Sequence, residues 1–140
     1  MVIECQRPLK RWTCFDVTKA LFALIRDDLN VSEISARTPD LHDALFLLSK
    51  EFPDFLGGYS FDERGDFAYS REFQTHLTAL EMAGHLSCPN PDFVGYQIRD
   101  KAVRNFTNYT AGLFSSDECD RLRTIAKRMV ELAKPRPIAV

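Results

Sequence analysis

The sequence has 140 residues, 45% of them hydrophobic, and a formal net charge of −2. This length and composition predict one globular domain over residues 1–140 and exclude a chain that is disordered throughout. No apolar run approaches the roughly 20 residues of a membrane span, and the N-terminus shows no secretory signal. We therefore expect a cytoplasmic protein with no membrane partner, in which segments 1–12 and 135–140 are flexible tails.

The N-terminal part of the chain predicts two amphipathic helices. Apolar residues recur at three- and four-residue spacing from Cys14 to Leu29, which indicates the first helix. Thr38 is a candidate N-cap for the second helix, with Pro39 in its first turn, and this helix should stop before Pro53. The polar residues between the two helices are expected to form a connector that could hold a short helical turn.

The middle of the chain predicts a short strand and a third helix. A glycine pair breaks the preceding helix just before Tyr59 and Phe61, whose alternation indicates a strand. Ser70 is placed to cap the third helix, and Gly84 is placed where a helix-ending glycine belongs.

The rest of the chain predicts a β-hairpin and two more helices. Strands at 86–88 and 93–98 would be joined by a turn over the two prolines of "PNPD". Residues 99–109 are a candidate helix. Ser115 and Glu118 then have the spacing of a capping box, which would open the last helix.

This order of elements is that of a winged-helix domain. The predicted fold class is therefore α+β, mainly helical, with a winged-helix-like core of three helices plus a β-hairpin wing and with additional C-terminal helices. In such a domain the helix before the hairpin is the one that would enter a DNA major groove, and the hairpin is the wing.

Three segments resemble a loose group of small bacterial and archaeal winged-helix proteins that includes domains of the Panacea antitoxin type. They are "LHDALFLLSKEF" at 41–52, "GDFAYSREFQTHLTALEMAGHL" at 65–86 and "LFSSDECDRLRTIAKRM" at 113–129. Such proteins commonly have a glycine-proline pair before the third helix, where this chain has Gly65-Asp66. The resemblance implies a winged-helix fold and an antitoxin-like, protein-binding role.

Basic residues decide whether DNA is a plausible partner, because lysine and arginine contacts to phosphate supply most non-specific affinity. The predicted third helix offers little such chemistry, whereas segment 121–136 carries six lysines or arginines against one glutamate. The alternative interpretation of this segment is a solvated helix whose charges complement the helix dipole. If nucleic acid is bound, the candidate contacts are Arg71, Arg99, Lys101, Arg104, Arg121, Arg123, Lys127 and Arg128.

No motif in the sequence indicates catalysis or a cofactor. His85 and Cys88 could supply two zinc ligands, with further ligands from His42, His76 or another cysteine. Structural zinc sites usually show two paired knuckles, however, and here there is one imperfect pair. Cys119 lies in the first turn of the last predicted helix, where acidic neighbours oppose a lowered thiol pKa. We expect reduced cysteines, no metal, no cofactor and no enzymatic activity.

Aromatic residues are the remaining signal, because they exceed what a small core needs and several fall in loops. They are Trp12, Phe15, Phe22, Tyr59, Phe61, Phe67, Tyr69, Phe106, Tyr109 and Phe114. Most would pack the helices against the hairpin, and some could form a partner surface or a homodimer seam. The predicted function is a non-enzymatic regulatory or protein-interaction module. The alternative is a DNA-binding transcriptional regulator that uses the basic last helix and the hairpin region.

Overall fold

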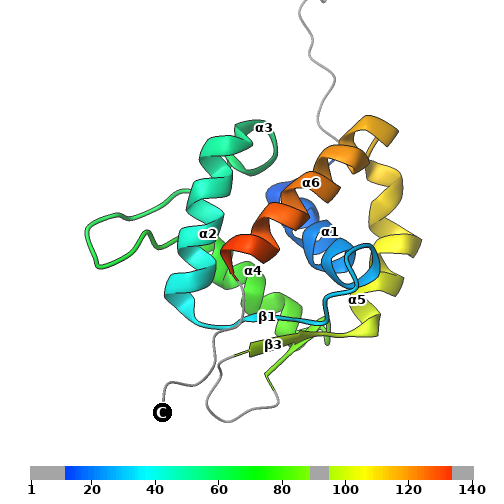
Figure 1. Cartoon of the computed structure of the whole chain (residues 1–140), viewed down its shortest axis with the longest axis horizontal. Coiled ribbons are helices and arrows are strands. Elements are labelled where there is room, and N and C mark those ends of the chain that lie inside the picture. Colours follow the sequence, from blue (N-terminus) through cyan, green and yellow to red (C-terminus); the bar gives the residue numbers. More distant parts are fainter. Residues whose placement is uncertain (1–11, 89–94, 134–140) are drawn as a thin grey trace, which may run out of the picture.

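The structure is a computed structural model that describes residues 12–88 and 95–133 (Figure 1). It is mainly helical with one small antiparallel sheet, so the coarse prediction of a mainly helical α+β chain is confirmed. The elements in chain order are α1 (Cys14–Asp27), β1 (Glu33–Ser35), α2 (Thr38–Glu51), α3 (Pro53–Leu56), α4 (Arg71–Met82), β2 (Leu86–Ser87), β3 (Gly95–Ile98), α5 (Asp100–Asn105), a π-helical turn (Phe106–Thr110), a 3-10 turn (Ala111–Leu113) and α6 (Ser116–Leu132).

Among the described helices, α1, α4 and α6 begin at side-chain caps, and Thr13 forms a capping box with Asp16 at the start of α1. Ser70 caps α4 by accepting from the N–H of Phe73, as predicted, and Ser115 and Glu118 form the predicted capping box of α6. Gly84 follows α4 with a φ of 84°, a left-handed conformation that suits glycine at the end of a helix. The prediction for α2 was off by one residue: Arg37 is the N-cap, and Thr38 is the first helical residue.

The sheet corrects two predictions. The expected connector before α2 contains strand β1, which pairs with β3 and gives the strand order β1-β3-β2. The strand expected at Tyr59 and Phe61 is not formed; the nearby backbone makes a single bridge between Asp62 and Tyr69. Both errors have one cause, since such short strands are specified by distant pairing more than by their own residues. The predicted turn, with Phe93 and Val94, lies outside the described residues.

The core surrounds α1, which lies between α6, α5 and the sheet in Figure 1. One expectation for the N-terminus is wrong, because Trp12 belongs to the core and not to a tail. Its ring stacks on Phe55 and Phe114 at centroid distances of 5.1 and 5.5 Å, and its indole N–H donates to Glu118. No helix in the described ranges is long and apolar enough to cross a membrane.

Candidate functional site

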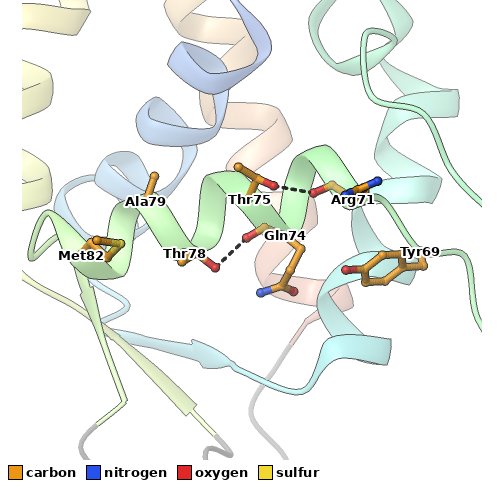
Figure 2. Close-up of a pocket in the computed structure, with 7 residues that line it drawn as sticks. All are labelled: Tyr69, Arg71, Gln74, Thr75, Thr78, Ala79 and Met82. Atoms are coloured by element: carbon orange, nitrogen blue, oxygen red, sulfur yellow. Dashed lines mark hydrogen bonds between the residues drawn. The ribbon is translucent and has the colours of Figure 1, made fainter.

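The outward side of α4 lines an open hollow of about 450 Å³ (Figure 2). Helical periodicity explains its composition: Phe73, Leu77 and Leu80 turn into the core, so the residues between them face solvent. We call this surface the α4 face; it consists of Tyr69, Arg71, Gln74, Thr75, Thr78, Ala79 and Met82.

The threonines of the α4 face satisfy their own hydroxyl groups. Thr75 donates to the carbonyl of Arg71 and Thr78 to that of Gln74, each at 3.0 Å, as the dashed lines in Figure 2 show. These hydroxyl hydrogens are therefore already used within the helix. What remains for a ligand is the amide of Gln74, the guanidinium of Arg71 and the apolar surface of Tyr69 and Met82.

Among the residues that the structure describes, no carboxylate lines the hollow, although α4 carries two. Glu72 turns to the preceding loop, where it accepts from the backbone N–H of Ser60 at 3.1 Å, and this bond lowers the pKa of Glu72. Glu81 turns to the sheet, where its carboxylate lies near Tyr96; the pKa of Tyr96 is raised first by burial and then by this carboxylate. The two acidic residues of α4 thus point away from the α4 face.

A buried histidine supports the α4 face from beneath. His42 of α2 is fully buried, and its Nδ1 accepts the backbone N–H of Ser70 at 3.0 Å. Its Nε2 lies 3.2 Å from Oε1 of Gln74, and its ring stacks on Tyr69 at 4.7 Å with an interplanar angle of 6°. Burial lowers the pKa of His42, so the neutral ring is favoured. The side chain of His42 therefore contacts Ser70, Gln74 and Tyr69 together.

A second polar cluster lies inside the fold, on the opposite side of α4. The hydroxyl of Tyr59 is 2.6 Å from Oγ1 of Thr18 and 2.7 Å from Nδ1 of His76, whose ring stacks on Phe15 at 4.6 Å. Burial raises the pKa of Tyr59 and lowers that of His76. These neutral groups tie α1, the loop before α4 and α4 itself together.

Most of the cations predicted to contact nucleic acid on α6 are used within the fold. Arg121 forms a two-pronged ion pair with Asp54 of α3 and lies over the ring of Phe55. The other paired arginines of α6 are Arg123, with Asp28 at 3.5 Å and Asp120 at 2.8 Å, and Arg128, with Glu51 at 3.2 Å. Lys127 is exposed and makes no ion pair with a described residue. The basic helix is thus largely neutralised by α1, α2 and α3.

Of the remaining predicted nucleic-acid contacts, one pairs within its own helix and three form no ion pair with a described residue. Arg104 pairs with Asp100 within α5 at 3.3 Å. Within the described ranges, Arg71, Arg99 and Lys101 are exposed and make no ion pair. Arg71 opens α4; at the other end, Lys101 lies beside Gly84 and the backbone N–H of Arg99 donates to the carbonyl of His85. The structure therefore gathers three exposed cations around the two ends of α4.

The thiols and the possible zinc pair have ordinary surroundings. His85 is buried and Cys88 half-buried, and the described residues hold no group of three histidines, cysteines or carboxylates that could bind a metal ion. Burial raises the pKa of Cys88 and of Cys119, which disfavours a reactive thiolate at either position.

The aromatic residues separate into core and surface. Trp12, Phe22, Tyr59 and Phe114 are buried, whereas Tyr69 and Tyr109 are exposed. Sequence reasoning singled out Tyr69 and Arg71 but missed Gln74, Thr75, Thr78, Ala79, Met82 and the supporting His42. A signal for the missed surface residues was present, because positions 71, 74, 75, 78 and 82 share one side of a helix and are uncharged after Arg71.

We compared the chain with models of protein families, with curated proteins and with solved structures. None of these comparisons finds a match.

Proposed function

We propose that this chain is a non-enzymatic regulatory module on a winged-helix-type scaffold, and that it binds a protein partner through the α4 face. The scaffold assignment is supported by the order α1-β1-α2-α4-β2-β3 together with the sheet order β1-β3-β2. In that scheme α4 corresponds to the exposed helix before the wing. An antitoxin-like role is one form that such protein binding could take.

The composition of the α4 face carries the proposal. Tyrosine, arginine and methionine are enriched in protein–protein interfaces, while lysine, aspartate and glutamate are depleted. The described residues that line the hollow include the first three types and none of the second three. Met82 is 84% exposed at one end of the hollow, and Tyr69 borders the other. A flexible, polarizable side chain such as methionine adapts well to a partner surface.

A non-enzymatic role is supported by how the histidines are used. His42 engages both ring nitrogens, with Ser70 and Gln74, and His76 engages Nδ1 with the hydroxyl of Tyr59. General acid–base catalysis needs a titratable group that reaches substrate near its own pKa. In these two residues burial favours the neutral ring, and the partners are groups of the fold itself.

Duplex DNA is the second candidate partner. It is favoured by Arg71, Arg99 and Lys101 around the ends of α4, which form no ion pair with a described residue, because phosphate contacts provide most non-specific DNA affinity. The form of DNA binding that this supports uses α4 and differs from the predicted use of the basic last helix, whose arginines are paired within the fold.

Selection from a displayed library of random peptides tests the proposal. We expect recovered peptides whose affinity falls about tenfold or more in Met82→Asp, since a carboxylate would then be desolvated in the interface. Leu47→Asp is the matched control, because Leu47 is also an exposed apolar residue, at 44%, but belongs to α2 and does not line the hollow. Its peptide affinity should equal that of the wild type.

The same two variants distinguish the candidates. If no recovered peptide is sensitive to Met82→Asp, the protein-binding proposal is wrong. If a random-sequence 30-base-pair duplex instead binds with an affinity that falls steeply with salt and is lost in Arg71→Glu, the DNA candidate replaces it.

A further inference from the structure

The hydrogen bonds of His42 determine which end of the Gln74 amide faces the hollow. The backbone N–H of Ser70 can only donate, so Nδ1 of His42 must be an unprotonated acceptor. A neutral ring then carries its proton on Nε2, and this N–H donates to the atom 3.2 Å away on Gln74, which must be the carbonyl oxygen. The amide nitrogen of Gln74 is left with both of its hydrogens.

This arrangement makes Gln74 a donor toward a ligand. Figure 2 shows its amide extending from α4 into the space beside Tyr69. One lone pair of Oε1 is taken by His42, whereas the amide N–H groups have no partner among the hydrogen bonds of the described residues. A ligand that lies across the hollow must therefore offer an acceptor at this point, since leaving a donor desolvated and unpaired is costly.

The orientation of Gln74 is fixed by packing as well as by hydrogen bonding. The ring of His42 lies between Tyr69, on which it stacks, and Phe73, which it meets edge-on at 5.1 Å. Because the ring is fully buried, it cannot turn without disturbing the cap of α4. Polar groups held in this way are organised before a ligand arrives, which reduces the ordering cost of binding.

We propose that Gln74 determines which partner the α4 face accepts, by donating to a carbonyl oxygen of an acidic polypeptide segment that lies in the hollow, and that His42 is the positioning residue for this contact. The inference rests on the proposed function. The acidic character follows from charge complementarity, since Arg71 and Lys101 border the two ends of α4 and make no ion pair with described residues.

Affinities of selected peptides, measured by calorimetry, test the contact itself. Gln74→Glu keeps the shape of the side chain but replaces its donors with acceptors, and we expect binding to weaken about tenfold or more. Gln97→Glu is the matched control, because it makes the same chemical change at an exposed residue of β3 that does not line the hollow. It should change affinity by less than about twofold. Equal affinity of the wild type and Gln74→Glu would overturn the inference.

Two replacements of His42 separate its two hydrogen bonds. His42→Gln places an amide N–H near the position of Nε2 and can still hold Gln74, whereas His42→Asn places an oxygen near Nδ1 and can hold only Ser70. We expect His42→Gln to retain most of the affinity and His42→Asn to lose about three- to tenfold at similar stability. A merely structural role would not produce this order, and the reverse order would contradict the positioning role.

Nitrogen-15 NMR of the free protein gives a readout that needs no ligand. The ring of His42 should be the neutral Nε2–H form at pH 7, and the side-chain amide signal of Gln74 should move in His42→Asn. A ring protonated on Nδ1 would overturn the inference whatever peptides bind. If no peptide binds at all, the proposed function fails together with it; if peptides bind without regard to Gln74, the inference alone fails.

Discussion

The outer faces of α4 and α6 both meet solvent, but their polar residues are used in opposite ways. On α6 three arginines reach across to carboxylates of other elements: Asp54 of α3, Asp28 at the end of α1 and Glu51 of α2. On α4 the outward residues contact their own helix or the buried His42. The charges of α6 thus join parts of the fold, and the α4 face stays available.

The contrast shows that a charged segment is a poor guide to a binding surface unless its partners are known. Segment 121–136 is the most basic part of the sequence, yet Arg121, Arg123 and Arg128 of α6 form ion pairs within the fold. The hollow lies instead on α4, whose charged residues are Arg71, Glu72 and Glu81. Its cations stand at its ends, and its acidic residues are turned toward Ser60 and Tyr96.

The largest effect is expected from removing the anchor of α6. Trp12→Ala deletes the ring that stacks between Phe55 and Phe114 and the N–H that bonds Glu118, so the free energy of unfolding should fall by about 3–5 kcal/mol. Urea unfolding measures it. Trp12→Phe keeps an aromatic ring and should lose less. A fall below about 1 kcal/mol in Trp12→Ala would mean that α6 is held by its ion pairs instead.

Local signals in the sequence predicted the helices well. Caps act over three or four residues, so Ser70, Ser115 with Glu118 and Gly84 could be located without knowledge of the tertiary structure. The apolar periodicity from Cys14 to Leu29 likewise predicted the first helix, and the structure buries apolar residues along α1. The mainly helical α+β class followed from these features.

The features that the sequence could not predict depend on distant contacts. Strand β1 exists because Ile34 pairs with Tyr96, about sixty positions further along the chain. Trp12 is core because Phe55 and Phe114 meet it. The candidate site has the same origin, since nothing local links a histidine of α2 to a glutamine of α4. No three- or four-residue pattern contains such pairings.

A smaller loss of stability, confined to α4, is expected at acid pH. All three histidines lie in or beside α4, none lies in α6, and burial lowers the pKa of each below its usual 6.5. The unfolded or opened state therefore binds protons first, and stability that is complete above pH 6.5 is lost as the pH falls through the folded-state pKa values.

Hydrogen exchange, corrected for the intrinsic rate at each pH, measures this difference. Between pH 7 and pH 5 the amides of α4 should lose more protection than those of α6. Asp62 and Glu72 do not contribute to this difference, because both stay charged between pH 7 and pH 5. The hydrogen bond to Arg64 lowers the pKa of Asp62 to about 2, and the pKa of Glu72 is also lowered. Equal loss in both helices would show that the histidines act only on global unfolding.

The smallest effect concerns the ion pairs that distinguish α6 from α4. Arg121 and Asp54 have side chains about half exposed, at 48% and 50%, so a double-mutant cycle of Arg121→Ala and Asp54→Ala should give a coupling of about 0.2–1 kcal/mol in unfolding. A pair this weak leaves the arginine open to competition from other anions. A polyanion such as DNA could compete with Asp54 for the arginine, so the same variants also test whether α6 differs from α4 in binding.

Peptide affinity at the α4 face should be unchanged in all three variants. If Asp54→Ala instead creates affinity for duplex DNA that Arg121→Ala removes, then the ion pairs of α6 can be exchanged for phosphate contacts. The outer face of α6 would then differ from the α4 face only in that carboxylates of the fold occupy its arginines.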